Sequence, residues 1–258
     1  SIMPFQRRTA MAIMDLVRSL KPDVRIVVGG YDPSLAPEVY TDVDDPKIDF
    51  LVKGEGEITF RELVRALEGD GAFEKVKGLS FRRDGVFHHN AGRGVAALEG
   101  DQIRPPRRSA RVLSGYTLLG RQIDVIETSR GCTFDCSFCS IIEMRGRNFH
   151  RFDVDRVIDD IRDAYEHGAR AIVFVDDNIT LNIARFETVC RAIIAAKLNS
   201  IDYSIQATTS SIADHGETLA PLMREAGFRY VFLGIENVVE EELVFLKASV
   251  KNKRRVNG

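Results

Sequence analysis

The feature of this sequence that most constrains its fold is the alternation of short apolar runs with segments of helical periodicity. Runs of strand length at 123–126, 171–175, 201–205 and 230–235 are separated by stretches in which apolar residues recur every three or four positions. Strands that alternate with helices in this way form parallel sheets whose faces are covered by the helices. The sequence therefore predicts an α/β fold, and its second half predicts repeated βα units that form either an open sheet or a barrel.

The first half of the chain shows the same alternation on a smaller scale. A helical pattern at 10–20 precedes strand-like runs at 24–28 and 48–52, and a second helical pattern follows at 60–67. The dipeptide Asp84-Gly85 then separates two further strand-like runs, which is a strong signal for a two-residue hairpin turn. We expect this hairpin to close a first α/β domain.

A change in composition marks the expected domain boundary. Residues 96–121 contain Pro105-Pro106 and little hydrophobic periodicity, which is typical of a linker. The predicted organisation is a first domain at 1–95, a linker over 96–121 and a second domain at 122–258.

Charge and hydropathy exclude two classes of protein. The 36 Lys and Arg residues nearly balance the 38 Asp and Glu residues, so no global positive field would recruit nucleic acid or an anionic membrane. The longest apolar runs have strand length and are far shorter than the roughly 20 residues that span a bilayer. We expect a folded protein with no membrane span and no nucleic-acid partner.

Three of the four cysteines, Cys132, Cys136 and Cys139, fall within eight residues. Such clustering indicates a metal site in a reducing compartment rather than a disulfide framework. The first residues lack the order of a signal peptide, because Arg7 and Arg8 interrupt the apolar stretch. These observations predict a cytoplasmic protein.

The three clustered cysteines have the spacing C-x3-C-x2-C in a loop that directly follows a predicted strand. Three thiolates can bind three irons of a cubane cluster, which leaves the fourth iron open to a small molecule. The alternatives are a zinc site or an electron-transfer cluster, and both normally use four protein ligands. His150, the nearest candidate for a fourth ligand, lies eleven residues after Cys139. The spacing favours the open cluster.

Residues 127–140, including the aromatic Phe138 before the third cysteine, resemble the signature of the radical S-adenosylmethionine (SAM) enzymes. The resemblance implies that the three cysteines bind a [4Fe-4S] cluster and that SAM chelates the open iron. It also implies that reduction, by an electron donor such as flavodoxin or ferredoxin, cleaves SAM to a 5'-deoxyadenosyl radical. A closed pocket would protect this radical from water.

The same resemblance extends to residues that follow the later strands of the second domain. Asp177, in the tripeptide Asp176-Asp177-Asn178, would contact the methionine part of SAM, and Glu236 belongs to a segment that resembles a G-I-E-S element. Gln206 follows the third strand, and Phe138 is implied by the signature itself. A carboxylate or amide that caps a loop or a helix N-terminus is the alternative for Asp177, Gln206 and Glu236.

The first domain resembles the later half of a flavodoxin-like cobalamin-binding domain. The resemblance rests on short segments and implies cobalamin contacts from Ser1, Met3, Gly29, Gly30, Gly54 and Glu55. Glycines at the end of a parallel strand allow a bulky ligand to approach the backbone closely. The expected fold is a partial cobalamin-binding domain followed by a partial radical SAM (β/α) barrel.

Two elements of the resemblance are missing. The D-x-H-x-x-G motif, whose histidine can replace the lower cobalt ligand, is absent, and only four of six expected barrel strands precede Gly258. We therefore expect the chain to be an internal fragment of a longer protein. No residue is assigned a catalytic role beyond the ligand sets above.

The leading function hypothesis is a cobalamin-dependent radical SAM enzyme that methylates, rearranges or cyclises a small-molecule substrate. A methylthiotransferase-like enzyme is the second hypothesis, although that class carries three further cysteines before the barrel and residues 1–131 contain none. A zinc or electron-transfer module is the non-enzyme alternative. Cys190 is expected to pack in a core, and the basic run 251–255 is expected to be solvated.

Overall fold

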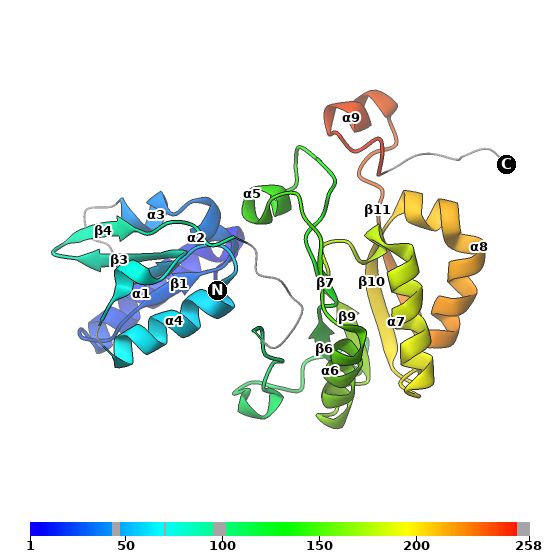
Figure 1. The fold of residues 1–258 in the computed structure, drawn as a ribbon, viewed down its shortest axis with the longest axis horizontal. Coiled ribbons are helices and arrows are strands. Elements are labelled where there is room, and N and C mark those ends of the chain that lie inside the picture. The colour runs from blue at the N-terminus through cyan, green and yellow to red at the C-terminus, as the bar shows by residue number, and fades with distance from the viewer. Residues whose placement is uncertain (43–46, 70, 95–101, 252–258) are drawn as a thin grey trace. The chain divides into compact units, whose positions relative to one another are not determined.

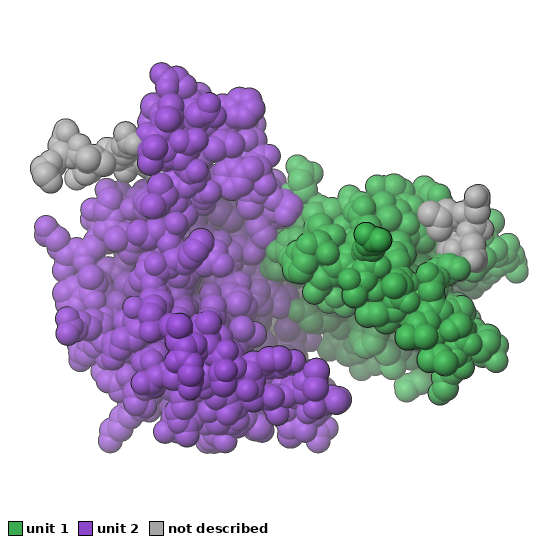
Figure 2. Space-filling model, turned by 180° about the vertical axis from the view of Figure 1, so that it is seen from behind, with its two compact units in different colours: residues 1–96, 143–145 green, residues 97–142, 146–258 purple. Residues whose placement is uncertain are grey.

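The computed structural model describes residues 1–42, 47–69, 71–94 and 102–251. The chain divides into two compact units, shown in Figures 1 and 2. Unit 1 comprises residues 1–96 and 143–145, and unit 2 comprises residues 97–142 and 146–258. Within the described ranges, no helix combines the length and the apolar character that a membrane crossing requires.

Unit 1 contains a four-stranded sheet in the order β1-β2-β3-β4. Strands β1 and β2 are parallel, and β3 and β4 are antiparallel to their neighbours. The elements are η1 (Pro4–Gln6), α1 (Arg7–Leu20), β1 (Val27–Gly29), α2 (Tyr31–Leu35), α3 (Glu38–Thr41), β2 (Phe50–Val52), α4 (Gly56–Glu68), η2 (Phe73–Lys75), β3 (Leu79–Arg83) and β4 (Val86–His89). The parallel pair matches the predicted α/β layer, and the hairpin makes the sheet mixed.

Alternate residues of β2 form the two hydrophobic cores of unit 1. Leu51 packs in a cluster with Met14 of α1, whereas Phe50 and Val52 pack in a second cluster with Leu63 of α4. Because successive strand side chains point to opposite faces, the sheet is the middle of three layers.

The hairpin turn predicted at Asp84-Gly85 is confirmed. Both residues have positive φ, 51° and 83°, as a two-residue turn between twisted strands requires. The predicted helix at the start of the chain is also present as α1, but Ile13 and Leu20 on it are exposed, and Met14 is the residue that is buried.

Unit 2 is built on a five-stranded sheet in the order β11-β10-β9-β6-β5. Its elements are η3 (Arg108–Ala110), β5 (Thr117–Leu118), β6 (Arg121–Ile126), β7 (Ser129–Arg130), α5 (Ile141–Arg145, whose last three residues belong to unit 1), β8 (His150–Arg151), α6 (Val154–Glu166), β9 (Ala171–Phe174), η4 (Ile179–Leu181), α7 (Ile183–Ala195), β10 (Asp202–Thr208), α8 (Thr209–Ala226), β11 (Phe228–Gly234) and α9 (Glu240–Phe245).

The strand order decides between the open sheet and the barrel. Strands β6, β9, β10 and β11 are mutually parallel and lie side by side in the order of the sequence. A doubly wound sheet would reverse its order at a switch point, whereas a barrel adds each strand in the same direction. The sheet is therefore a curled half-barrel with helices α6, α7 and α8 along one side (Figure 1).

An aromatic cluster joins the half-barrel strands to their helices. The ring centroids of Phe174, Tyr203 and Phe228, one from each of β9, β10 and β11, lie 5.2–5.7 Å apart. Phe186 of α7 meets Phe228 edge-on at 5.3 Å. Such contacts add to the hydrophobic burial of these large side chains. This face of the sheet is thus filled, which leaves the carboxyl ends of the strands for polar side chains.

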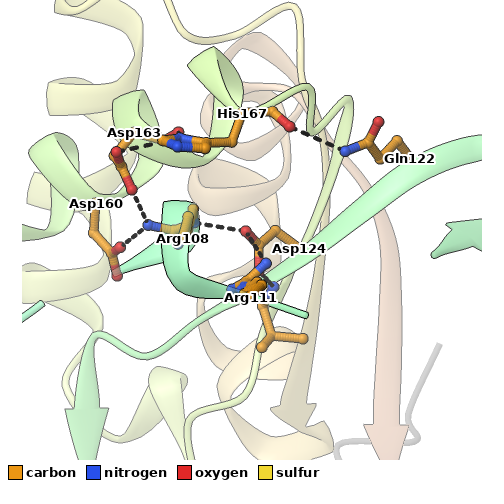
Figure 3. A network of polar contacts seen from close by, with 8 residues as sticks. Arg108, Arg111, Gln122, Asp124, Asp160, Asp163 and His167 are labelled. Atoms are coloured by element: carbon orange, nitrogen blue, oxygen red, sulfur yellow. Dashed lines mark hydrogen bonds and ion pairs between the residues drawn. The ribbon is translucent and has the colours of Figure 1, made fainter. Parts of the chain in front are cut away.

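The described part of the predicted linker includes an arginine buried in unit 2, Arg108 of η3 (Figure 3). Arg108 donates to Asp124 on β6 at 2.6 Å and to Asp160 and Asp163 on α6 at 2.6 and 2.7 Å. Arg111 donates to the other oxygen of Asp124 at 2.8 Å. Burial raises the pKa of Asp124, but hydrogen bonds from Arg111 and Arg108 outweigh burial and hold that pKa below its ordinary value.

Candidate functional site

A cavity of about 640 Å³ in unit 2 opens at the carboxyl ends of β9, β10 and β11. Active sites of βα barrels lie at this edge. All the residues that the sequence predicts to bind the cluster or SAM line the cavity. They are Cys132, Cys136, Cys139, Phe138, Asp177, Gln206 and Glu236. The structure therefore brings together residues separated by up to 104 positions, and the role of each one stays a prediction.

The cluster loop, defined as residues 127–140, follows β6, and backbone pairing holds its first residues in place. Strand β7 in this loop pairs with β8, and Cys132 forms a bridge with Arg147. Gly131 between them has φ of +92°, and a Cβ atom there would lie 2.4 Å from the backbone oxygen of Asn148. Only glycine fits this close approach without a shift of the backbone.

The buried carboxylate of Asp176 holds the first part of the cluster loop. It accepts hydrogen bonds from the Thr128 N–H at 2.8 Å, the Thr128 hydroxyl at 2.6 Å and the Ser129 hydroxyl at 2.5 Å. Burial raises the pKa of Asp176, and these hydrogen bonds oppose that rise. Asp176 thus connects the end of β9 to the residues that follow β6.

Asp177 and Asn178, which follow Asp176, contact the part of the cluster loop that contains Cys132. Asp177 accepts from the Gly131 N–H at 2.7 Å. The side-chain amide of Asn178 lies 3.8 Å from Cys132 Sγ and donates toward it. Asn178 is 5% exposed, so this donor is shielded from water.

The three clustered thiols differ in exposure. Cys136 is buried, and Cys132 and Cys139 are half-buried. Burial raises the pKa of the Cys136 thiol, while the positive charge of Lys251 opposes the rise. Among the described residues, no three His, Cys, Asp or Glu side chains converge as a single metal ion would require. A cubane cluster makes a different demand, because each thiolate binds its own iron, and three thiols around one cavity fit that donor set.

Lys251 is a cavity residue that the sequence analysis missed. Its ammonium group pairs with Glu236 and lies 5.9 Å from the ring centroid of Phe138. Glu236 itself has a positive φ of 59°, which turns the chain at the end of β11. The basic run beginning at Lys251 was expected to be solvated. For Lys251 this expectation is wrong, because the chain after α9 returns to the cavity, and the rest of the run lies outside the described residues.

Cys190 lies apart from the other cysteines, in α7. Its side chain is fully buried beside core residues of that helix, and it is not among the residues that line the cavity. Burial raises the pKa of its thiol to about 12. A neutral buried thiol behaves as a small hydrophobic group, which agrees with the packing role that we expected.

In unit 1, the residues predicted to contact cobalamin meet at the carboxyl ends of β1 and β2. The backbone N–H of Ile2 donates to the Gly29 oxygen at 2.8 Å, which places the first residues of the chain beside β1. Gly30 has φ of +102°, and a Cβ atom there would lie 2.5 Å from Ser1 Oγ. Met3 follows this contact and is 36% exposed.

One serine joins the two glycine turns of unit 1. Ser34 donates its hydroxyl hydrogen to the Gly30 oxygen at 2.6 Å and accepts from the Gly54 N–H at 2.9 Å. Gly54 has φ of +71° with no atom within 4 Å of the position of a Cβ, so its outer side faces open space. Glu55 follows as the N-cap residue of α4. These positions form a glycine-lined edge, and their contacts with cobalamin stay predictions.

Comparison with known protein families gives two matches along the chain. The model of the radical SAM superfamily matches residues 126–257, which is more than half of the chain, and the model of the B12 binding domain matches residues 1–64. The first match contains the cluster loop and the cavity, and the second contains the glycine-lined edge of unit 1.

Individual proteins show the same two-part similarity. An uncharacterized methyltransferase of Pyrococcus horikoshii is 31% identical over 250 residues, which cover 96% of this chain and 53% of that protein. The anaerobic magnesium-protoporphyrin IX monomethyl ester cyclase of a Synechocystis species is 31% identical over 241 residues, covering 91% of this chain and 46% of that protein. The chain thus spans about half the length of these relatives.

A solved structure shares the fold. The cobalamin-dependent S-adenosylmethionine radical enzyme OxsB, with aqua-cobalamin and S-adenosylmethionine bound, superposes with a TM-score of 0.71 at 22% identity, covering 96% of this chain and 37% of that one. The match supports the arrangement of a half-barrel after a flavodoxin-like sheet. With the three cysteines in one cavity and the family match over that cavity, the chain belongs to the radical SAM superfamily and carries a B12-binding domain before its radical SAM domain.

Proposed function

We propose that the complete protein cleaves SAM reductively at a [4Fe-4S] cluster and uses cobalamin to methylate, or radically rearrange, a small-molecule substrate. The observation that carries the proposal is the single cavity that three cysteines share with polar side chains from the ends of three parallel strands. When bound, the cluster would supply an electron, cobalamin would supply a methyl group, and SAM would supply a carbon radical. One relative is named a methyltransferase, which supports methylation, and another is named a cyclase, which shows that relatives of this chain are not all methyltransferases.

The chain's own residues would bind and shield the cofactors. Cys132, Cys136 and Cys139 would hold three irons and leave the fourth facing the cavity. Because the cavity is lined in part by apolar side chains such as Phe134, Ile142 and Phe232, it would limit the access of water to a reactive intermediate.

SAM carries an ammonium, a carboxylate and a sulfonium group, and the cavity offers a partner for each sign of charge. Glu236 and Asp177 would accept hydrogen bonds from the amino group, which is a neutral amine when it binds iron, and Lys251 would donate to the carboxylate. Gln206 can hydrogen-bond a ribose hydroxyl or the base, and the exposed ring of Phe138 offers a stacking surface. We propose these five residues as the SAM site.

Matched lysine variants test this assignment. Lys251→Met should weaken SAM binding to the reconstituted protein about tenfold, because a charge-assisted hydrogen bond is lost. Lys247→Met is the control, since Lys247 pairs with Asp135 on the surface and does not line the cavity. Equilibrium dialysis with labelled SAM measures both. Equal binding by the two variants would remove Lys251 from the SAM site.

Anaerobic reconstitution with iron and sulfide tests the cluster. We expect about four irons per chain and an absorption spectrum that changes when SAM is added, because one iron has no thiolate ligand. Stoichiometric zinc with no response to SAM would favour the zinc-module alternative. The B12-binding match over residues 1–64 favours cobalamin chemistry over the methylthiotransferase alternative.

We propose that residues 1–95 are the C-terminal half of the cobalamin-binding domain and that the glycine-lined edge faces the ligand. Gly30 is unsuited to a test, because any side chain there collides with Ser1 and Ile2. Gly54→Asn is suitable, since Asn tolerates positive φ and its side chain would enter open space. Gly85→Asn, at the equally open hairpin turn with φ of +83°, is the matched control.

Cobalamin uptake by the complete protein distinguishes the two glycine variants. Gly54→Asn should lower bound cobalamin at least about tenfold, while Gly85→Asn should bind like the parent, because only the first side chain would occupy the ligand's space. If both variants bind equally, the edge does not contact cobalamin. If the parent takes up none, unit 1 shares only its fold with the B12-binding family.

The proposed chemistry also implies partners and a location. Reductive cleavage needs a low-potential electron donor such as flavodoxin or ferredoxin, and three free thiols in one loop need a reducing compartment. We propose a cytoplasmic enzyme that depends on such a donor. Reduction of the reconstituted cluster by purified flavodoxin or ferredoxin, followed by EPR spectroscopy, tests the dependence on such a donor.

A further inference from the structure

A buried relay of hydrogen bonds ends at the sulfur of Cys132. The Thr208 N–H, at the end of β10, donates to Thr180 Oγ1 at 3.3 Å, and the Thr180 hydroxyl donates to Asn178 Oδ1 at 3.1 Å. The Asn178 amide nitrogen then lies 3.8 Å from Cys132 Sγ. The relay therefore connects the ends of two strands to the first cysteine of the cluster loop.

The relay fixes which end of the Asn178 amide faces the sulfur. Because the Thr180 hydroxyl occupies Oδ1, the NH₂ group is directed at Cys132. Asn178, Thr180 and Thr208 are 5%, 1% and 3% exposed, so water does not compete for these bonds. A fixed donor in a buried environment interacts more strongly with a negative charge than the same donor in water.

A purely structural role does not account for this orientation. Asn178 precedes the short helix η4, but its side chain makes no capping hydrogen bond to that helix. By contrast, Asn182 four residues later caps α7, where it accepts from the Arg185 N–H at 3.0 Å. The two asparagines of this segment thus make different contacts: the Asn182 side chain caps a helix, and the Asn178 side chain points at Cys132.

We propose that Asn178 is a positioning residue that donates an N–H···S hydrogen bond to the Cys132 thiolate and thereby raises the reduction potential of the bound cluster. The inference rests on the proposed cluster and concerns a residue outside its ligand set. A hydrogen bond to a ligating sulfur withdraws electron density from the iron, which favours the reduced, more negative cluster. Asp176 and Asp177 hold residues 128–131 of the same loop, so the sulfur stays within reach of the amide.

The test is a redox titration of the reconstituted complete protein, followed by EPR spectroscopy. Asn178→Ala should lower the equilibrium constant for cluster reduction about tenfold, which is about 59 mV for a one-electron couple. Thr180→Val should shift it in the same direction by less, because the amide remains but loses the hydroxyl that orients it. Asn182→Ala should lower thermal stability through the lost cap and leave the potential unchanged.

The outcomes separate this inference from the proposed function. A parent protein that binds no cluster contradicts the proposed function. A parent with a normal cluster and an Asn178→Ala potential equal to that of Asn182→Ala overturns the role of Asn178. If Asn178→Ala binds no iron, Thr180→Val decides, since a lower potential supports the relay and an unchanged potential overturns it.

Discussion

Both units have their predicted ligand site at the carboxyl ends of parallel strands, but the site of unit 1 is lined by glycines and that of unit 2 by polar side chains and thiols. In unit 1, the carboxyl ends of β1 and β2 carry glycines, and Gly54 presents bare backbone to open space. In unit 2, the equivalent edge carries thiols, carboxylates and amides around one cavity. The difference teaches that topology fixes where an α/β fold can form a site, whereas the residues at that edge decide whether it offers bare backbone or thiol and carboxylate groups.

Asp32 in unit 1 and Asp176 in unit 2 are buried carboxylates that are stabilised in different ways. Asp32 in unit 1 accepts two hydrogen bonds from Arg7, at 2.7 and 2.6 Å, and one from the Tyr40 hydroxyl at 2.6 Å. The bonds from Arg7 hold the pKa of Asp32 below its ordinary value. Asp176 in unit 2 is held by N–H and hydroxyl groups such as those of Thr128, and burial raises its pKa. An arginine thus neutralises Asp32 directly, as Arg108 and Arg111 neutralise Asp124 in unit 2, whereas Asp176 beside the cluster loop is held by uncharged donors.

The largest expected effect is the loss of the cluster from unit 2. Cys132→Ala, Cys136→Ala or Cys139→Ala should each abolish cluster binding and SAM cleavage, because each variant removes one of the three proposed iron ligands. Cobalamin binding by unit 1 should remain. Iron content and the yield of cleaved SAM measure the effect.

Cys190→Ala is the matched control for the cysteine series. It removes a fully buried side chain of α7 and should cost stability of about 1 kcal/mol, with iron content unchanged. A Cys190 variant that loses iron would contradict the division into ligands and packing residues.

A second large effect is expected at the glycine of the cluster loop. Gly131→Ala should reduce iron content strongly, because the new Cβ would meet the Asn148 backbone oxygen at 2.4 Å and φ is positive. Gly216→Ala in α8 is the control, since its nearest neighbour would lie at 3.8 Å, and it should stabilise the helix by up to about 1 kcal/mol. Equal iron content in the two variants would show that the loop geometry is not required.

The next effect concerns the ion network that fixes residues 108–111 to β6 and α6 within unit 2 (Figure 3). Arg108→Ala should destabilise unit 2 by about 3 kcal/mol, because it removes a buried cation that pairs with Asp124, Asp160 and Asp163, while Asp124 keeps its bonds from Arg111. Arg111→Ala should cost less, since the Arg111 side chain is 38% exposed. Calorimetry on both variants measures the difference, and equal melting temperatures would refute the ranking.

The smallest expected effect is the contribution of Asp32 to the acid dependence of unit 1. Because the folded-state pKa of Asp32 is depressed, its stabilising contribution is complete above the unfolded value of about 3.9 and is lost as pH falls through the folded value. Asp32→Asn should remove this acid dependence and cost about 1.5–3 kcal/mol at neutral pH. Melting temperatures recorded from about pH 2 to pH 7 measure both. An Asn variant that keeps the acid dependence of the parent would assign it to another group.

The sequence alone determined those features whose signals are local. The βα alternation, the Asp84-Gly85 turn and the three cysteines of one loop each depend on residues within a few positions of one another. The apolar periodicity predicted helix α1 correctly, because helical periodicity is also a signal between residues three or four positions apart. It did not reveal that Ile13 and Leu20 stay exposed, because exposure depends on which other elements cover the helix.

Tertiary structure decided what distant segments do together. The choice between open sheet and barrel depends on the order of β6, β9, β10 and β11, which periodicity does not encode. Asn178 reaches Cys132 because β6 and β9 end at one edge of the sheet, and Lys251 reaches the cavity because the chain returns to that edge after α9. Such contacts have no local sequence signature, since hydrogen bonds and ion pairs depend on distance in space and a single sequence specifies only order along the chain.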